Sequence, residues 1–319
     1  MKIEKYRPIL VSFVTILMSS ALPISAESFD PPDRTEARKQ LEAAMKIGDL
    51  DAQVEPAEVI ALAELMDYFE ASYGLLRIHC QREDLTAAFE TVEAMLDAGF
   101  WDYRRLLGDE ELALINNGEE LREMIRDARA EGYIAMLERE SRDEMQHPDK
   151  IMSSLAIQPG EVVADIGAGS GYFTVRAAAA VGGTGRVIAT DIRQQMLDHI
   201  DARLQAGAIS NVELLKVESE DPGLPPGEID TVLMVDVMHY VKDRSSYARK
   251  LKPALAPGGR VVVIDFRYDP KAEREFAPYP DQQVPRATLD EEMAGAGFEV
   301  AESFDFLPEQ YFVIYRVAE

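Results

Sequence analysis

From about residue 141 to residue 319, short apolar runs alternate with helical segments, and this alternation limits the possible folds more than any other feature. The segments between the runs, such as Tyr172–Val181 and Gln194–Ala206, have helical composition. Regular β-α alternation predicts an α/β fold with a doubly wound parallel sheet. The predicted strands of this kind are Val162–Ile166, Arg186–Thr190, Val212–Val217, Thr231–Val235 and Arg260–Phe266.

Two further apolar runs, Phe298–Ser303 and Tyr311–Val317, follow with no helical segment between them. Parallel neighbours need a long crossover, so these two runs are expected to pair as an antiparallel hairpin. The prediction for this region is therefore a seven-stranded sheet that ends in an antiparallel hairpin.

The first predicted strand leads into a glycine-rich turn, Asp165-Ile166-Gly167-Ala168-Gly169-Ser170-Gly171. Glycines let a ligand approach the backbone closely, and the next helix points its first amides at the same place. The dinucleotide fingerprint has the spacing G-x-G-x-x-G, whereas the third glycine comes one residue earlier here. Asp191 ends the second strand, where a carboxylate can accept hydrogen bonds from ribose hydroxyls. The pattern indicates a nucleotide-type cofactor other than a dinucleotide.

Five motifs in this order resemble the class I S-adenosylmethionine-dependent methyltransferases, and the resemblance covers about residues 141–319. They are Asp165–Gly171, Thr190-Asp191-Ile192, Glu218-Ser219-Glu220-Asp221, Val235-Asp236-Val237-Met238-His239-Tyr240, and Pro257-Gly258-Gly259 with Val261–Asp265. The terminal antiparallel hairpin is also a hallmark of that Rossmann-like fold. The resemblance implies a methyltransferase (EC 2.1.1.-) that uses S-adenosyl-L-methionine.

The resemblance also implies which residues bind this cofactor. The backbone of Gly167–Gly169 would contact the methionine part, with Asp165 orienting the turn. Asp191 would hold the ribose, Ile192 would cover the adenine, and Glu218 would accept a hydrogen bond from the adenine amino group. Glu218 replaces the usual aspartate, and a solvated acidic loop is the alternative reading of this segment. The full implied set is Asp165, Gly167, Ala168, Gly169, Gly171, Asp191, Ile192, Glu218, Ser219 and Asp236.

A narrower resemblance lies upstream, where residues 142–148 read Arg-Asp-Glu-Met-Gln-His-Pro. An uncharacterised bacterial subfamily of methyltransferases has R-D-x-W-Q-x-P here, and Met145 replaces its tryptophan. The resemblance implies that this segment folds over the cofactor and that Gln146 hydrogen-bonds the methionine end. The run Leu307–Phe312 is similar to the end of the same subfamily.

His239 and Tyr240 lie just beyond the fourth predicted strand, at the edge where open α/β sheets bind ligands. They are the predicted catalytic residues, with His239 nearest the methyl acceptor; the alternative is that His239 only shapes the pocket wall. Segments 267–270 and 277–285 are expected to wall a pocket for a small organic acceptor. Two alternatives stay open: a protein methyltransferase that captures a polypeptide with its helical domain, and a non-catalytic cofactor-binding or docking protein.

Residues 27–140 are predicted to form a small all-α domain before the methyltransferase domain at 141–319. Within it, Leu75–Arg82 and Thr86–Ala98 resemble a tetratricopeptide-type helical hairpin joined by a polar turn. His79 and Cys80 are expected to pack in the core of this hairpin, and Trp101 to anchor it.

Residues 1–26 combine a basic start, an apolar stretch at Ile9–Met18 and a small-residue tail that ends in Ile24-Ser25-Ala26. This pattern is typical of an export signal, which predicts a periplasmic or secreted protein. An uncleaved membrane tether is the alternative.

The composition argues against several classes of partner and site. The chain has 33 basic and 58 acidic residues, a formal net charge of −25, which repels phosphate backbones and argues against nucleic acid. Its single cysteine excludes an intramolecular disulfide and any thiolate zinc cluster. The four histidines have no metal-ligand spacing, so no metal site is expected.

Overall fold

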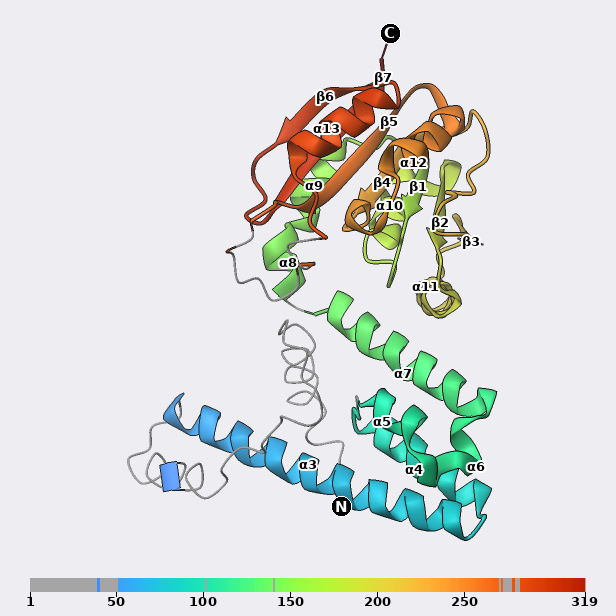
Figure 1. The fold of residues 1–319 in the computed structure, drawn as a ribbon. Coiled ribbons are helices and arrows are strands. Elements are labelled where there is room, and N and C mark those ends of the chain that lie inside the picture. Colours follow the sequence, from blue (N-terminus) through green and yellow to red (C-terminus); the bar gives the residue numbers. More distant parts are fainter. Residues whose placement is uncertain are drawn as a thin grey trace. The chain divides into compact units, whose positions relative to one another are not determined.

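The computed structural model describes residues 39–40, 51–100, 102–139, 141–269, 271, 277–278 and 282–318 (Figure 1). The predicted signal segment 1–26 and Trp101 lie outside the described residues. The chain divides into two compact units, Met1–Gly132 and Tyr133–Glu319. This division lies somewhat before the predicted boundary at residues 140 and 141, because the final turns of one helix pack with the second unit.

The first unit is helical throughout its described part. Its elements are α3 (Asp51–Gln81), α4 (Leu85–Asp97), α5 (Tyr103–Gly108), the 3-10 helix η2 (Glu110–Leu112), α6 (Ala113–Asn116) and most of α7 (Glu119–Leu137). α3 is one continuous helix that runs through Gly74, whereas the sequence predicted that the first helix of the hairpin begins only at Leu75. Nothing lies within 4 Å of a Cβ built on Gly74, so this glycine stands on an open side of α3 and does not interrupt it.

The hairpin of α3 and α4 forms as predicted. Asp84 caps α4 by accepting a hydrogen bond from the backbone N–H of Ala87 at 3.1 Å, and Gly99 ends the helix with a φ of 89°. The hairpin packs a core in which Cys80 is buried, as expected, next to Leu76 and Val92. The likeness to tetratricopeptide repeats stays a prediction.

The second unit contains a seven-stranded sheet, which confirms the predicted fold class. The strand order is β3-β2-β1-β4-β5-β7-β6; the first five strands are parallel, and β7 pairs antiparallel with both β5 and β6. The strands are β1 (Val162–Ile166), β2 (Arg186–Asp191), β3 (Val212–Lys216), β4 (Ile229–Val235), β5 (Leu255–Phe266), β6 (Phe298–Phe304) and β7 (Gln310–Val317).

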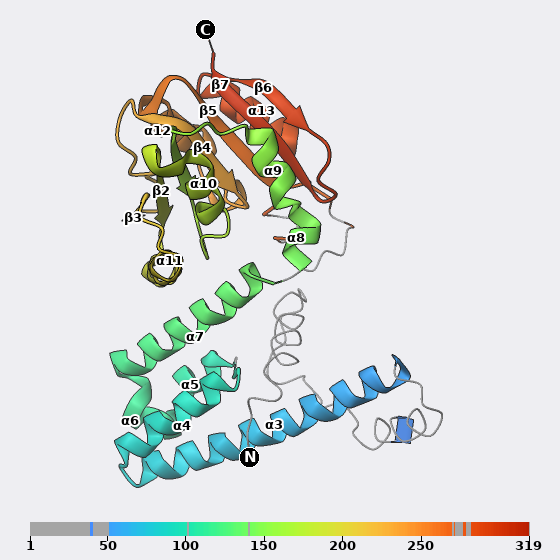
Figure 2. The same cartoon turned by 180° about the vertical axis from the view of Figure 1, so that it is seen from behind.

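Helices cover both faces of this sheet. α9 and α10 pack on one face and α12 and α13 on the other; seen from behind, α9 lies in front of the sheet (Figure 2). Side chains along β1 and β5 alternate between the two cores, as the two-residue period of a strand requires. The helices are α8 (Ser141–Gln146), α9 (Pro148–Leu155), α10 (Thr174–Val181), α11 (Gln194–Ala206), α12 (Arg244–Leu251) and α13 (Arg286–Gly295), with the 3-10 helices η3 (Gly182–Thr184), η4 (Met238–Tyr240) and η5 (Lys252–Ala254).

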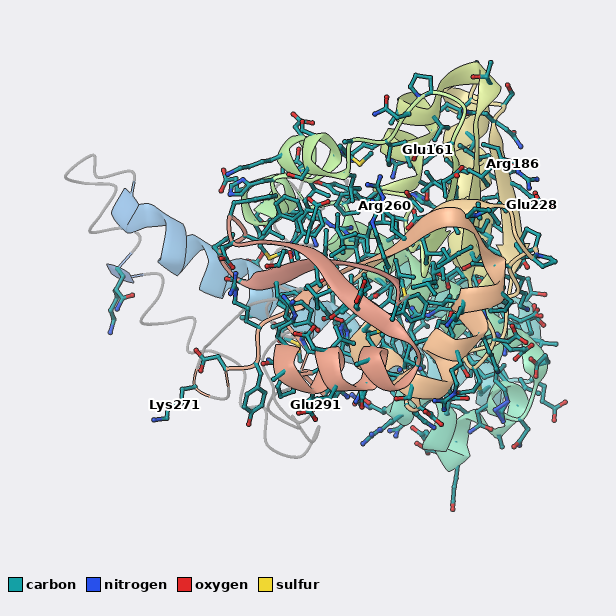
Figure 3. The ribbon with its side chains drawn as sticks, turned by 90° about the horizontal axis from the view of Figure 1, so that it is seen from above. Glu161, Arg186, Glu228, Arg260, Lys271 and Glu291 are labelled. Atoms are coloured by element: carbon teal, nitrogen blue, oxygen red, sulfur yellow. The ribbon has the colours of Figure 1, made fainter. Side chains whose placement is uncertain are left out.

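The two ends of the parallel strands differ in character. At the amino ends, Arg186 forms an ion pair with Glu228, and Glu161 and Arg260 lie in the same charged region (Figure 3). The carboxyl ends of β1, β2 and β4 all meet at the opposite edge, where parallel α/β sheets bind ligands. No helix in the described part of the chain is long and apolar enough to cross a membrane.

Candidate functional site

A cavity of about 340 Å³ opens at this carboxyl edge. Its volume lies at the lower end of the range for small-molecule sites. All of its lining residues belong to the second unit. They are Tyr133, Leu137, Arg142, Ile166, Gly167, Ala168, Gly169, Asp191, Ile192, Arg193, Val217, Glu218, Ser219, Val235, Asp236, Val237, Tyr240, Val241 and Tyr247.

The glycine turn after β1 forms the floor of the cavity. Gly167 and Gly169 have φ values of 66° and 55°, in the left-handed region that glycine tolerates best. A Cβ on Gly167 would lie 2.7 Å from Cγ2 of Val237, and a Cβ on Gly169 would lie 2.9 Å from Cδ1 of Leu137. Both positions therefore need glycine, and the bare backbone of the turn faces the cavity.

Asp191 joins the end of β2 to this turn. One carboxylate oxygen accepts from the backbone N–H of Gly169 at 3.0 Å and the other from the N–H of Arg193 at 2.9 Å. Only 7% of Asp191 is exposed; burial raises its pKa, although these backbone donors oppose the rise. The side chain is thus held rigidly at the cavity wall with its remaining lone pairs available to a ligand.

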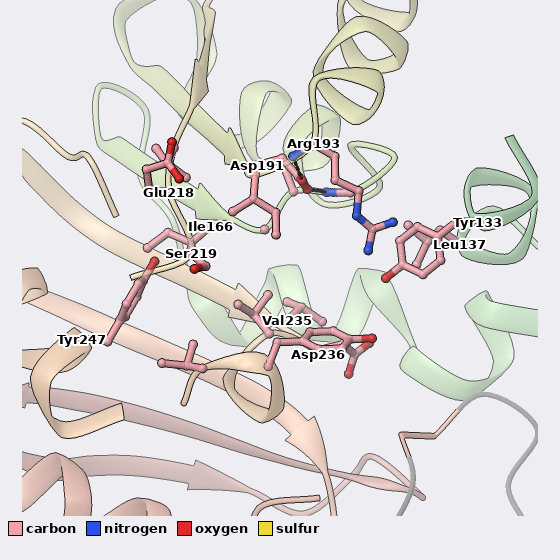
Figure 4. Close-up of a pocket in the computed structure, with 18 of the residues that line it drawn as sticks. Tyr133, Leu137, Ile166, Asp191, Arg193, Glu218, Ser219, Val235, Asp236 and Tyr247 are labelled. Atoms are coloured by element: carbon pink, nitrogen blue, oxygen red, sulfur yellow. Dashed lines mark hydrogen bonds between the residues drawn. The ribbon is translucent and has the colours of Figure 1, made fainter. Parts of the chain in front are cut away.

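The predicted adenine-binding residues Ile192, Glu218 and Ser219 also line the cavity. Figure 4 shows Glu218 on the same side of the cavity as Tyr247, and Tyr133 on the opposite side. The carboxylate of Glu218 and the ring of Tyr247 thus stand on one side of the cavity, and the ring of Tyr133 on the other.

Two residues of the predicted glycine motif, Asp165 and Gly171, do not line the cavity. Asp165 is buried below the turn and accepts a hydrogen bond from Oγ1 of Thr174 at 2.6 Å. Burial raises the pKa of Asp165 to about 6. Gly171 has a φ of 77° and packs against Ile200, so both residues shape the turn from behind.

Asp236, directly after β4, lines the far part of the cavity. Its φ of 58° is rare for a residue other than glycine, and the backbone is tied to Ile264 by a 2.8 Å hydrogen bond. The carboxylate accepts from Nε2 of Gln146 at 2.8 Å and from Nε2 of Gln310. Burial, together with the charge of Asp265, raises the pKa of Asp236 to about 6.

Gln146 is fully buried and does not line the cavity. Its side-chain amide joins two residues that line the cavity. The amide oxygen accepts a hydrogen bond from Nε of Arg142 at 2.7 Å, and the amide nitrogen donates one to Asp236. The sequence indicated the segment but gave no sign of this bridge.

The two predicted catalytic residues lie in different surroundings. Tyr240 lines the cavity and is 59% exposed. The His239 side chain is only 3% exposed and stands outside the lining, with Nδ1 2.7 Å from Oδ1 of Asp265. Burial lowers the pKa of His239, but the hydrogen bond and the charge of Asp265 outweigh it, so the pKa is raised. Its catalytic role stays a prediction.

Sequence reasoning did not single out several residues that the fold brings to the cavity or its support. Arg142 stands in a segment whose pattern did attract notice, and Asp265 ends the apolar run of β5. No signal in the sequence linked Tyr133, Leu137, Arg193 or Tyr247 to this place, because each reaches it through packing between distant segments.

The residues present fit S-adenosylmethionine. The ligand needs close backbone approach, a carboxylate for its ribose, polar groups for its adenine and charged groups for its amino-acid end. The bare glycine turn, Asp191, Glu218 with Ser219, and Asp236 with Arg142 supply these in one cavity. In the described part of the chain, no cluster of three or more histidine, cysteine or acidic side chains is arranged to hold a metal ion.

Comparisons with known proteins agree with this site. Residues 164–261 match a family model described as a methyltransferase domain. The ubiquinone/menaquinone biosynthesis C-methyltransferase UbiE of Ectopseudomonas mendocina is 32% identical over 111 residues, which cover 34% of this chain and 43% of that protein. The same-named protein of Escherichia coli K12 is 31% identical over 111 residues, covering 34% and 44%. The match thus spans less than half the length of these curated relatives.

The fold also matches a solved structure. The S-adenosylmethionine-dependent methyltransferase of Aquifex aeolicus superposes with a TM-score of 0.54 and 24% identity, over 58% of this chain and 97% of the other. At 24% sequence identity, this comparison shows only that the two proteins share a fold. Residues 164–261 thus match a methyltransferase domain, and the second unit around them has the fold of a class I S-adenosylmethionine-dependent methyltransferase.

Proposed function

We propose that the protein transfers the methyl group of S-adenosylmethionine to a small organic acceptor. The observation that carries this proposal is the convergence of the glycine turn, Asp191 and Glu218 on one cavity at the carboxyl edge of the sheet. In this proposal the acceptor enters beside Tyr240, which is exposed and borders the same cavity.

The chain's own residues would act mainly by positioning. When bound, the cofactor supplies an electrophilic methyl group on a sulfonium. Asp191 orients the ribose, and the turn at Gly167–Gly169 leaves no side chain between backbone and ligand. Leu137 and Val237 lie beside the glycine turn, where their apolar side chains would exclude water. Holding two reactants in line can supply about 7–11 kcal/mol of barrier reduction in favourable cases.

A proton must leave the acceptor if it is a hydroxyl or an amine. His239 is the proposed group to hold that proton, at Nε2, with Asp265 fixing the ring through Nδ1. The tilted contact with Tyr240, at 4.0 Å between ring centroids, places His239 one side chain behind the cavity wall. Proton transfer would then require a small rotation of Tyr240.

The relatives support a small-molecule acceptor, because their names describe C-methylation in ubiquinone/menaquinone biosynthesis. A polypeptide acceptor captured by the helical unit is the competing proposal. Labelled methyl donor added to a cell extract with the purified protein distinguishes them: label in the small-molecule fraction supports our proposal, label in protein supports the other, and no label supports a docking role.

Calorimetric titration with S-adenosylmethionine, S-adenosylhomocysteine and NAD tests the cofactor directly. We expect micromolar binding of the first two and none of NAD. Asp191→Asn should weaken binding about 10- to 100-fold, since one charged hydrogen-bond partner of the ribose is lost. Asp198→Asn, on the exposed side of α11, is the matched control and should bind normally. Binding of NAD alone would contradict the proposal.

A further inference from the structure

An arginine stands at the opening of the cavity. Arg193 lines the cavity and is exposed, as are Ile192 and Tyr240, so these three residues mark the side that is open to solvent. In the part of the chain that the structure describes, no carboxylate lies within 4 Å of the Arg193 guanidinium, and no oxygen accepts a hydrogen bond from it. The N–H donors of this side chain are therefore available to a ligand.

A tyrosine ring holds this arginine in place. The guanidinium carbon of Arg193 lies 4.4 Å from the ring centroid of Tyr133, and Figure 4 shows the arginine pointing toward that ring. The oxygens of Asp191 accept from the backbone N–H groups of Gly169 and Arg193, not from the guanidinium. The charge of Arg193 only opposes the rise that burial causes in the pKa of Asp191. Stacking thus fixes the cation at the cavity and leaves its charge in place.

Two phenol hydroxyls accompany the cation. Tyr133 and Tyr240 both line the cavity, and their side chains hydrogen-bond each other. Burial raises the pKa of both phenols; the hydrogen bond adds to this rise for Tyr240 and opposes it for Tyr133, which identifies Tyr240 as the donor. The hydroxyl hydrogen of Tyr133 is then available to a ligand as well. A guanidinium and a phenol that both donate at one opening favour an anion.

The cofactor does not supply this anion in the proposed site. Its carboxylate faces Arg142, which is buried, and its uncharged ribose faces Asp191. The group that pairs with Arg193 therefore belongs to the second ligand, the methyl acceptor, which enters beside Tyr240.

We propose that the methyl acceptor is a small organic acid whose carboxylate pairs with Arg193 and accepts a hydrogen bond from Tyr133. This inference rests on the proposed function and names the class of its acceptor. The planar fork of a guanidinium matches the paired oxygens of a carboxylate. A dianionic phosphate matches less well, because Asp191, Glu218 and Asp236 give the cavity three acids against two arginines.

The carboxylate is the anchor of the acceptor and not the group that is methylated. Pairing with Arg193 makes it a weaker nucleophile, so another atom of the acid attacks. That atom forms a bond to the methyl carbon while the carbon–sulfur bond breaks, and the electron pair of the broken bond stays on sulfur. A proton on the attacking atom passes to Nε2 of His239. The product therefore keeps its carboxylate and can be recognised by its charge.

The charge of the labelled product tests this inference. The full chain is incubated with labelled S-adenosylmethionine and the small-molecule fraction of a cell extract, and the products are applied to an anion exchanger at pH 7. The unreacted donor carries a net positive charge and is not retained. We expect the labelled product to be retained and then released at about pH 2, where a carboxylic acid is neutral. A phosphate ester would still be charged at that pH and would stay bound.

Variants connect this product to the arginine. Arg193→Gln should raise the amount of the acid fraction needed for half-maximal rate about 10- to 100-fold, because a charged hydrogen-bond partner is lost. Its affinity for S-adenosylhomocysteine should stay that of wild type. Arg193→Lys should shift the amount less, since it keeps the charge, and Tyr133→Phe by about 2- to 10-fold. Arg186→Gln is the matched control, an arginine paired with Glu228 at the amino ends of the strands, and should change neither quantity.

Three results would overturn the inference and leave the proposed function in place. The label enters small molecules that do not behave as carboxylic acids on the exchanger, Arg193→Gln needs no more of the acid fraction than wild type, or Arg193→Gln loses as much affinity for S-adenosylhomocysteine as for the acid. Thermal melting checks that each variant is folded. If folded wild type labels no small molecule at all, the proposed function itself is wrong.

Discussion

At the scale of single residues, the buried carboxyl of Asp165 supports the glycine turn through Thr174 but lowers the stability of the folded protein at neutral pH. Its carboxyl is fully enclosed and its pKa is raised from 3.8 to about 6. The folded protein therefore holds a proton that the unfolded chain releases, and the free energy of unfolding falls as the pH rises from about 4 to about 6. Above that range the penalty stays constant.

Asp165→Asn should remove this penalty. The amide oxygen can still accept from Thr174, so at pH 7.5 we expect the variant to be about 2–3 kcal/mol more stable than wild type, and equal to it at pH 4. Urea unfolding at several pH values measures the difference. A gain that is the same at every pH, or a loss at all of them, would contradict this account.

The charge of Asp236 predicts a pH dependence of binding. Burial and Asp265 raise its pKa to about 6, while Arg142 and His239 oppose the rise. Only the ionised carboxylate of Asp236 can pair with the ammonium at the amino-acid end of the cofactor. The affinity for S-adenosylhomocysteine should therefore fall, by up to about tenfold per pH unit, once the pH drops below 6.

An analogue of S-adenosylhomocysteine that lacks the amino group provides the comparison for this measurement. It carries no ammonium, so its affinity between pH 7.5 and pH 5 should not follow the same curve. If calorimetry gives both ligands the same pH profile, Asp236 does not face the ammonium.

At the scale of elements, α3 shows that tertiary packing can extend a helix beyond the bounds that the local sequence predicts. The sequence predicted the first hairpin helix only from Leu75 onward, yet the helix continues through Gly74, with Phe69, Tyr73 and Leu76 packed in one core with α4. Gly74→Ala should therefore stabilise the protein by about 0.5–1 kcal/mol, because it reduces the freedom of the unfolded chain and meets nothing in the fold.

Gly171→Ala gives the contrasting case. Gly171 has a φ of 77°, and a Cβ there would lie 3.0 Å from Cγ1 of Ile200. Thermal unfolding should show a lower midpoint for this variant and a higher one for Gly74→Ala. A lower midpoint for both would mean that Gly74 has a packing role that its surroundings do not reveal.

The strand ends were predictable to within two residues, except that β5 begins at Leu255, five residues before the predicted Arg260. β1 and β4 are apolar runs between polar turns, and the absence of a helix between β6 and β7 required antiparallel pairing. The turn and Asp191 were predictable as well, since both lie at strand ends. The pairing of His239 with Asp265 and the bridge through Gln146 were not, because they depend on contacts between segments far apart in the chain.

At the scale of the whole molecule, two compact units predict two unfolding transitions. The cavity lies entirely within the second unit. S-adenosylhomocysteine at 100 times its Kd should add about 2.7 kcal/mol to that unit alone and raise one midpoint by about 5–11 °C. Differential scanning calorimetry of the full chain measures this. A single transition, or an equal shift of both, would show that the units unfold together.

The place of β7 in the sheet has a consequence for biosynthesis. β7 follows every other strand in sequence, yet it lies between β5 and β6 and carries Gln310, a partner of Asp236. A ribosome delivers about 5–20 residues each second and in order. The glycine turn is thus synthesised well before Gln310, which supports Asp236. β6 has no partner strand until β7 is synthesised. The hydrogen bond from Gln310 to Asp236 therefore forms only after β7 has paired with β5, and a chain that ends before Gln310 lacks this support of the cavity wall.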